Sequence, residues 1–402
     1  MRRTVMITWN LSSYHGWGVY GLNLALNWAR DPDLKLVCAH PIDPEMLSLD
    51  PLGAAVLQPF IRDTAQTVAS LAANAGQAAQ STGPVLLSLD DRGVADKAAH
   101  GVALTGHPTL GVAFFVTPRL PPESRERLGA LDLIVAGCAW NAELLRANGV
   151  ERVATVLQGI NPALFHPAPR LGLFPDRFLV FSGGKLERRK GQDIVLAAFK
   201  QFAARHRDAV LVTAWHSPWP EVARGLETSG LTAPVPFRPN GDVDVGAWAA
   251  ANGIGPGQLI DLGMPANASM PALLREMDVA LFPNRAEPGT NLVAMEAMAC
   301  GVPTILSANT GHLDLIEPDN AYPLTRQTAS DRPAEAPFGD LTGWGESDIE
   351  EIVEALEAAY ANRDEARRRG LKGAETLARL TWGRTAAEMK AAIQACGATA
   401  AP

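Results

Sequence analysis

Two segments in the second half of the chain contain side chains that could bind an anionic substrate. The first is GGKLERRKG, residues 183 to 191, with the cations Lys185, Arg188, Arg189 and Lys190. Glycines let the backbone approach a phosphate closely, a following helix offers free N–H groups, and lysines add mobile charge. The pattern predicts an anion-binding loop that includes Gly184. The alternative is a solvated surface loop, because runs of charge usually face water.

The second segment is RAEPGTNLVAMEAMACG, residues 285 to 301, directly after the apolar run VALFP. Thr290 or Asn291 can cap a helix here, and a glycine followed by a proline can end it. From Leu292 to Cys300 this helix is apolar or small on every side except at Glu296. Such a helix is buried, and a buried carboxylate needs donors, which either a ribose diol or a structural arginine can supply.

A second carboxylate, Glu287, precedes this helix in the loop after the strand. In open α/β sheets, ligands bind beyond the carboxyl ends of the strands. We therefore expect Glu287 to face a ligand at that edge.

The elements that position these segments alternate between short β-branched runs and longer helical patterns, as in parallel α/β folds. Strands are predicted at residues 4–9, 34–40, 85–89, 110–116, 133–137, 153–159, 177–184, 209–215, 258–263, 279–283 and 303–308. The clearest helical patterns lie at 21–30, 140–148, 193–205, 347–361 and 382–396. Residues 323–347 are predicted as a long loop.

The strands form two series separated by the proline-rich stretch 166–176. We therefore expect two Rossmann-like domains facing a cleft. The first comprises residues 1–168 together with residues 380–402, a C-terminal helix that packs back. The second, residues 169–379, contains both chemical segments.

Composition limits the class of protein. The chain has 402 residues, is 47% hydrophobic and has a formal net charge of −8, which disfavours disorder and a nucleic-acid partner. Its four cysteines form no metal-ligand spacing, and no apolar run approaches the roughly 18 residues of a spanning helix. We expect a reduced, cytoplasmic protein without a metal, and leave open peripheral contact with the inner membrane face.

In their order, the segments resemble the retaining family 4 glycosyltransferases of GT-B fold. The resemblance rests on GGKLERRKG and EPGTNLVAMEAMACGVPTI, on LQGINPALFHP (157 to 167) before them, and on the segments around Trp344 and Trp382 after them. It covers most of residues 133 to 390.

The resemblance implies roles for particular residues. Lys185 stands where the family more often has arginine and Lys190 matches its lysine, so both would bind the donor diphosphate. Glu296 matches the second of two paired glutamates and would accept the ribose hydroxyls. Glu287 matches the first, near the donor sugar, although the spacing of nine is one more than is common. Backbone amides of residues 289 to 292 (Gly289, Thr290, Asn291 and Leu292) would hold the sugar or its phosphate.

The implied activity is that of a hexosyltransferase of polysaccharide biosynthesis. It would move a hexose, with retention, from a nucleotide-diphosphate sugar to a saccharide or lipid-linked acceptor, without metal or other cofactor. The alternatives are a nucleotide-sugar epimerase, a phosphorylase of similar fold, or an inactive nucleotide-sugar-binding scaffold. The donor base, the donor sugar and the acceptor carry no legible motif.

A third glycine-rich segment, HGWGVYG, gives Gly16, Gly18 and Gly21 the spacing G-x-G-x-x-G. Six residues separate Gly16 from the first strand, too many for the tight turn of a dinucleotide site. The resemblance suggests instead that a loop around Gly18 approaches the acceptor and the donor phosphate.

Two further patterns could be mistaken for sites. The sequence DVD, Asp242 to Asp244, resembles a metal-binding pattern, but no apolar strand leads into it, and we interpret it as a turn. His15, His40, His107 and His216 could each line the cleft, and none can be assigned a catalytic role.

Overall fold

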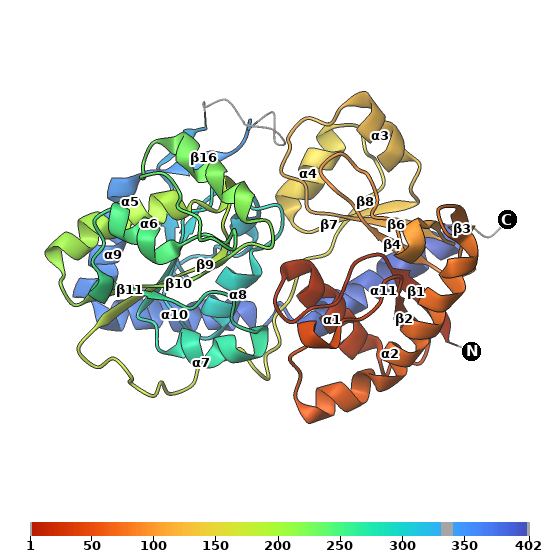
Figure 1. Cartoon of the computed structure of the whole chain (residues 1–402), viewed down its shortest axis with the longest axis horizontal. Helices are drawn as coiled ribbons and strands as arrows, with labels where there is room; N and C mark the ends of the chain where they lie inside the picture. Colours follow the sequence, from red (N-terminus) through yellow and green to blue (C-terminus); the bar gives the residue numbers. More distant parts are fainter. Residues whose placement is uncertain (1, 331–340, 400–402) are drawn as a thin grey trace. The chain divides into compact units, whose positions relative to one another are not determined.

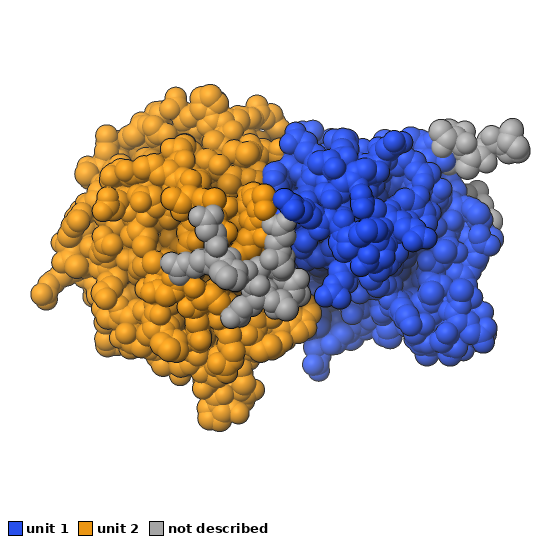
Figure 2. Space-filling view, turned by 90° about the horizontal axis from the view of Figure 1, so that it is seen from above, with its two compact units in different colours: residues 1–159, 266–268, 380–402 blue, residues 160–265, 269–379 orange. Residues whose placement is uncertain are grey.

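The computed structural model describes residues 2–330 and 341–399, and within them the chain forms two compact α/β units. Unit 1 comprises residues 1–159, 266–268 and 380–402, and unit 2 comprises residues 160–265 and 269–379 (Figure 2). The chain thus leaves unit 1 after residue 159, before the predicted boundary at 168, touches it again at residues 266–268 and returns to it at residue 380. The predicted fold class is confirmed, because each unit is built on one six-stranded parallel sheet.

Unit 1 has the strand order β2-β1-β4-β6-β7-β8. Its strands are β1 (Arg3–Ile7), β2 (Leu34–Cys38), β4 (Val85–Ser88), β6 (Thr109–Ala113), β7 (Leu133–Ala136) and β8 (Val153–Thr155), with a separate pair β3 (Ala78–Gln80) and β5 (Ala103–Thr105). Its α-helices are α1 (Gly16–Trp28), α2 (Pro51–Leu71), α3 (Pro122–Gly129), α4 (Ala139–Ala147) and α11 (Trp382–Thr399).

The last helix packs back onto unit 1, as the sequence predicts. Trp28 Nε1 on α1 donates to the Ala386 carbonyl at 3.2 Å, and Thr385 Oγ1 donates to the Leu157 carbonyl at 2.8 Å. Lys390 bonds Asp31 and Asp33 at 2.7–2.9 Å. In Figure 1, α11 (blue) accordingly lies among the red and orange elements of unit 1.

Unit 2 has the strand order β11-β10-β9-β12-β13-β14. Its strands are β9 (Phe178–Lys185), β10 (Ala209–His216), β11 (Leu259–Asp261), β12 (Val279–Phe282), β13 (Thr304–Ser307) and β14 (Tyr322–Leu324), with an antiparallel pair β15 (Gln327–Ala329) and β16 (Gly345–Ser347). Its α-helices are α5 (Gln192–Arg205), α6 (Val245–Ala251), α7 (Met270–Arg275), α8 (Leu292–Ala299), α9 (Ile349–Ala361) and α10 (Arg363–Leu377).

The core of each unit lies between its sheet and the covering helices. In unit 2, Phe178, Val180 and Leu211 of the sheet pack with Phe199 and Phe202 of α5, and all five are fully buried. The near-continuous apolar runs of these strands follow from this burial on both faces.

Several elements depart from the prediction, which also lacks α3, α6, α7, β3, β5 and β14. The first helix begins at Gly16 instead of Gly21. Helix α2 was not predicted, because its interior contains Pro59 and its composition is small and polar; Asp50 caps it by accepting from the amides of Leu52 and Gly53. Helix α10 was missed because it contains few apolar residues and two glycines.

The predicted loop 323–347 is only partly described, since residues 331–340 lie outside the described ranges. Its described parts include β15 and β16. The prediction of a loop is therefore wrong where these two short strands pair, and also at residues 323 and 324, which belong to β14.

Candidate active site

The two chemical segments meet at one point of the unit 2 sheet. The chain runs outward from β9 to β10 and β11, then returns to the other side of β9 with β12. The loops leaving β9 and β12 therefore diverge from neighbouring strands, and this switch point is where open parallel sheets bind ligands. GGKLERRKG comprises the last three residues of β9 and the turn after it, and the Glu287 loop follows β12.

Two glycines shape the cation loop. Gly184 has φ 133° and Gly191 has φ 71°, a region that disfavours side chains. A Cβ on Gly191 would lie 2.5 Å from the Pro283 carbonyl oxygen, and one on Gly184 would lie 3.6 Å from Lys190 Cδ. Glycine thus lets the backbone turn at both positions, and at Gly191 it also avoids a clash with the Pro283 carbonyl.

The cations of this loop are not a solvated face. The exposed fraction of the side chain is 33% for Lys185, 13% for Arg189 and 11% for Lys190. Arg188 is buried and donates to Thr228 Oγ1 at 2.6 Å. The alternative of a surface loop is therefore rejected.

Two buried carboxylates link these cations. Glu187 pairs with Lys185 at 2.8 Å and with Arg189, and Glu287 pairs with Arg189 at 3.0 Å and with Lys190 at 2.7 Å. These three cations and two carboxylates leave one positive charge in excess. Such a cluster is suited to an anion that adds negative charge at its open side.

The network fixes the ionisation of its members. Burial alone would raise the pKa of Glu287, but Lys190 and Arg189 outweigh it and hold that pKa at about 2. Burial lowers the pKa of Lys190, an effect that Glu287 partly offsets. Burial likewise opposes ionisation of Glu187, whose pKa is nevertheless lowered by Arg189 and Lys185. Both carboxylates are charged at neutral pH.

The structure corrects the expected setting of Glu287. Its side chain is 6% exposed, and its oxygens accept from Arg189, from Lys190 and, at 2.7 Å, from Asn284 Nδ2. In this state the carboxylate aligns the cations instead of facing outward, so contact with a sugar stays a prediction.

The loop that carries Glu287 is held by the short 3-10 helix η8 (Thr310–Asp314), which follows β13. Thr310 Oγ1 accepts from the Glu287 amide at 2.7 Å, and the Gly311 amide donates to the Glu287 carbonyl at 2.9 Å. A Cβ on Gly311 would lie 1.7 Å from the Gly289 carbonyl oxygen. Only glycine fits this contact.

His312 of η8 positions the residue that begins α8. Its Nε2 lies 2.9 Å from Asn291 Nδ2, and its Nδ1 lies 3.2 Å from the Ser307 carbonyl. These partners require a proton on Nδ1 and a bare Nε2, since an amide nitrogen donates and a carbonyl accepts. Burial lowers the pKa of His312 to about 4, so the ring is neutral. No sequence motif signals this histidine.

The predicted cap of α8 is correct in position but not in mechanism. Asn291 precedes the helix with φ 57°, yet its side chain makes no capping bond and instead reaches His312 and, at 3.5 Å, Lys190 Nζ. Thr290 Oγ1 lies 2.9 Å from Met295 Sδ. The first amides of α8, starting at Leu292, lack intrahelical acceptors, as at any helix start.

Helix α8 is buried, as its composition predicts, and Gly301 with φ 79° ends it. Glu296 is 6% exposed. Burial raises the pKa of the Cys300 thiol to about 12, with Glu296 adding to the rise. Glu296 and Cys300 therefore share one face of α8, and contact of Glu296 with a ribose stays a prediction.

A buried arginine that the sequence analysis did not single out fixes the start of the Glu287 loop. Arg285 is fully buried and pairs with both oxygens of Asp193 at 2.7–2.8 Å and with Glu346 at 2.8 Å. Asp193 lies in the first turn of α5, directly after the cation loop. This pair ties the two loops of the switch point together.

In unit 1, Gly18 lies inside α1 and not in a loop. A Cβ at this position would lie 2.3 Å from Ser12 Cβ, and one on Gly21 would lie 2.7 Å from Trp9 Nε1. The predicted glycine-rich loop is therefore wrong, because these glycines let the helix pack against the segment that follows β1. Ligand binding by Gly18 stays a prediction.

A pocket of about 330 Å³ opens at the carboxyl ends of β1, β2 and β4 in unit 1. It is lined by Thr8, Trp9, Asn10, Trp17, His40, Ser88, Asp96 and Lys97. Ser88 Oγ donates to Asp96 at 2.7 Å, which orients that carboxylate. The chain also reverses direction across the sheet between β1 and β4, so this pocket occupies the corresponding switch point.

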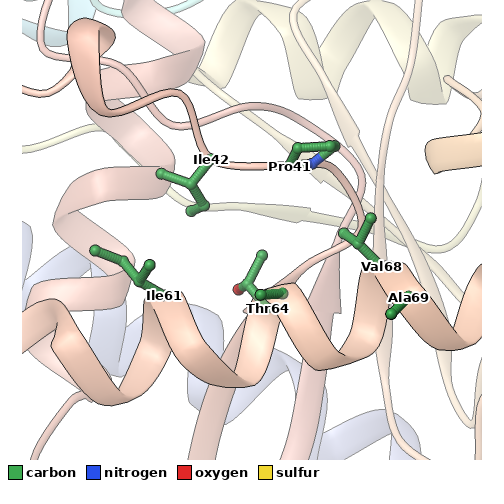
Figure 3. A pocket seen from close by; sticks show the side chains of 7 residues that line it. Pro41, Ile42, Ile61, Thr64, Val68 and Ala69 are labelled. Atoms are coloured by element: carbon green, nitrogen blue, oxygen red, sulfur yellow. The ribbon is translucent and has the colours of Figure 1, made fainter.

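A second pocket of unit 1, of about 320 Å³, differs in character. Pro41, Ile42, Ile61, Thr64, Val68 and Ala69 project into it from the loop after β2 and from α2 (Figure 3). Because this lining is almost wholly apolar and bears no charge, we do not assign a phosphate or sugar to it.

The remaining sequence candidates lie elsewhere. Asp244 caps α6 by accepting from the Ala247 amide at 3.0 Å, which agrees with a turn. His15 precedes α1, His107 lies beside Gln80 and His216 ends β10, whereas His40 lines the polar pocket. Within the described ranges, every helix is too short or too polar to cross a membrane.

Part of the chain is similar in sequence to known glycosyltransferases. Residues 265–389 match the model of the family described as "Family 4 Glycosyltransferase in conflict systems". A D-inositol 3-phosphate glycosyltransferase 1 of Catenulispora acidiphila is 30% identical over 193 residues, which are 46% of this chain and 43% of that protein. One of Streptomyces bingchenggensis is 30% identical over 200 residues, 46% and 40% of the two chains. The alignments thus span less than half of these relatives.

Solved structures match the whole fold. Sucrose-phosphate synthase from Thermosynechococcus elongatus superimposes with a TM-score of 0.67 at 16% identity, over 99% of this chain and all of that one. Anabaena Alr3699/HepE, in complex with UDP-glucose, gives 0.63 at 12% identity, over 98% of this chain and all of that one. The chain therefore has the GT-B fold. Its residues 265–389 are similar to family 4 glycosyltransferases, in agreement with the resemblance drawn from its motifs.

Proposed function

We propose that the chain is a retaining glycosyltransferase that moves a hexose from a nucleotide-diphosphate sugar to a saccharide or lipid-linked acceptor. The observation that carries the proposal is the setting of Lys190, whose ammonium lies 2.7 Å from Glu287 and 3.5 Å from the side chain of Asn291, the residue before α8, at the switch point of unit 2. A fixed cation beside a helix start is suited to a diphosphate.

The names of similar proteins support this donor class. The curated relatives are named as glycosyltransferases, and the Anabaena protein was solved with UDP, with UDP and glucose, and with UDP-glucose. We infer the same general donor for this chain, with its base and sugar left open.

The mechanism follows from where charge develops. As the bond between sugar and diphosphate breaks, the leaving group gains negative charge, and donors already aimed at it stabilise the transition state. Lys185, Lys190 and the amides from Gly289 to Leu292 supply such donors, and Glu287 acts by holding Lys190. These cations provide the neutralisation, so the proposed reaction requires no metal.

Retention requires the acceptor to attack the face from which the diphosphate departs. In the proposed step, the acceptor oxygen bonds to the anomeric carbon while the bond to the diphosphate breaks. A diphosphate oxygen takes the acceptor proton, so no protein nucleophile is needed. Glu296 would accept the ribose hydroxyls, which fixes the donor for this step.

The polar pocket of unit 1 supports the acceptor side of the proposal. The pocket has a volume of about 330 Å³ and is lined by indoles, a carboxylate, an amide and an imidazole. Such a lining suits a sugar, which has both apolar and polar faces. Asp96 and His40 are candidates for contact with acceptor hydroxyls.

The test is a panel of nucleotide sugars and free nucleoside diphosphates, assayed by thermal shift and by release of nucleoside diphosphate with and without saccharide acceptors. A ligand specific to the folded state raises the melting temperature. Transfer predicts release that depends on acceptor and persists in EDTA. Absence of binding and turnover across the panel would refute the proposal, and loss of product in EDTA would refute its metal independence.

Replacing Lys190 tests the role of its charge. Lys190→Ala should lower turnover by about 10²–10³-fold, since removal of one transition-state donor has an effect of this size. Lys200→Ala, at an exposed position of α5, is the matched control and should retain turnover. Equal activity of the two variants would contradict the assignment.

A further inference from the structure

Two large apolar side chains are exposed at the carboxyl edge of the unit 2 sheet, the edge that carries the cation loop. Trp219 is 57% exposed and lies three residues beyond the end of β10, and Met264 is 37% exposed and lies three residues beyond the end of β11. Strand β10 borders β9, and β11 borders β10. Both side chains therefore follow strands on the side of the cation loop away from β12.

Trp219 is coupled directly to the cation loop. Lys185 Nζ lies 5.2 Å from the centre of the indole ring and 2.8 Å from Glu187. The same ammonium thus contacts an aromatic ring on one side and the ion-pair network on the other. A cation over an indole face is attracted by the ring electrons, which keeps the ring next to the proposed phosphate site.

The backbone under both side chains is held by local hydrogen bonds. The Trp219 amide donates to Ser217 Oγ at 3.1 Å, and that hydroxyl donates back to the Trp219 carbonyl at 2.9 Å. Asp261 at the end of β11 accepts from Thr213 of β10 at 2.8 Å and from the Gly263 amide at 3.3 Å. The exposed ring is therefore presented from an ordered turn.

We propose that Trp219 is the stacking surface for the base of the nucleotide, with Met264 at the border of the same subsite. This inference rests on the proposed function, because it assumes that the diphosphate occupies the loop after β9. A nucleotide joins its phosphates to a flat aromatic base through one ribose. An indole beside the phosphate cation is suited to that base, since every base has a face that stacks on an aromatic side chain.

The proposal separates two contributions to nucleotide affinity. The cations bind the phosphates whatever is attached to them, whereas Trp219 acts only on ligands that carry a ring. Because stacking tolerates every base, Trp219 should raise affinity for nucleotides in general, without choosing among bases.

The experiment compares binding of UDP, GDP and inorganic pyrophosphate to the full chain by titration calorimetry. Trp219→Ala should weaken UDP and GDP by about tenfold or more and leave pyrophosphate unchanged. Trp219→Phe should retain most of the affinity for both nucleotides. Met264→Ala should show a smaller loss, confined to the nucleotides. Leu371→Ala, at a 46% exposed position of α10, is the control for loss of an exposed apolar group.

The outcomes distinguish this inference from the proposed function. Equal weakening of pyrophosphate and UDP in Trp219→Ala would show that the indole only holds Lys185, and would overturn the inference. Unchanged UDP binding in that variant would also overturn it while leaving the proposed function intact. If the unaltered chain bound none of the three ligands, the proposed function would fail first. Melting temperatures of all variants establish that each is folded.

Discussion

The switch points of the two sheets offer ligands different surroundings. In unit 2 the carboxyl ends of β9 and β12 carry a buried network of lysine, arginine and glutamate. In unit 1 the carboxyl ends of β1 and β4 border an open pocket of indoles, hydroxyls and an imidazole, where Asp96 and Lys97 are exposed. Similar topology thus provides the place, and the residue types at the strand ends decide which ligand chemistry fits it.

The largest difference expected between the two regions is in stability. Glu287→Gln keeps the shape of the side chain but leaves Lys190 and Arg189 without their shared counter-charge. Breaking a buried pair on one side costs about 3–5 kcal/mol. We expect a loss of this size in the free energy of unfolding, measured by urea denaturation. Glu375→Gln is the control, because Glu375 pairs with Lys372 at the surface and should leave stability unchanged. Equal stability of the two variants would contradict a buried network.

The next largest effect is expected from acid, which should lower the free energy of unfolding by protonating His312 of unit 2. The folded pKa of about 4 lies below the ordinary 6.5, because burial disfavours the charged ring. The unfolded chain therefore binds the proton more readily, so the stabilisation is complete above pH 6.5 and lost as the pH falls to 4. By linkage this loss is up to about 3 kcal/mol.

The measurement is the free energy of unfolding at pH 7, 5.5 and 4.5. His312→Gln keeps an acceptor for Asn291 but cannot titrate, so its stability should change less over this range. An identical pH profile for both proteins would contradict the buried neutral ring. Glu287, with its pKa at about 2 and an ordinary value of 4.5, contributes a separate loss below pH 4.5.

The smallest effect is expected in the unit 1 pocket. Asp96→Asn removes the charge that Ser88 orients at 2.7 Å, and we expect about a tenfold lower acceptor-dependent turnover, near the lower end for a positioned polar group. Binding of UDP should not change, because the residues proposed to bind the donor lie in unit 2. Asp90→Asn, at a neighbouring exposed loop position, is the control. Weakened UDP binding in Asp96→Asn would contradict the proposal that the unit 1 pocket binds only the acceptor.

The sequence predicts every strand of the two six-stranded sheets except β14, because buried parallel strands are runs of apolar residues, whereas β14 is short and contains a proline. It also locates the cation loop and α8, since lysines, glycines and a lone glutamate in an apolar helix are conspicuous. Both segments can be recognised from residues that are close together in the sequence.

What escapes prediction depends on contacts between distant positions. His312 supports Asn291 through a hydrogen bond from a separate loop, 21 residues further along the chain, and a histidine is not informative alone. The role of Gly18 depends on Ser12 lying against α1, which no spacing rule encodes. Trp219 becomes informative only once β10 is known to lie beside β9.

The return of α11 to unit 1 has a consequence for biosynthesis. All of unit 2 lies between residues 159 and 380 of unit 1, so α11 is synthesised only after unit 2. N-terminal domains generally fold first during synthesis. Here unit 2 can be complete while Trp28 still awaits Ala386, and Asp31 still awaits Lys390. Unit 2 can thus fold before unit 1 is complete. A stop codon at residue 380 would remove α11 from unit 1 and leave all residues of unit 2 in place.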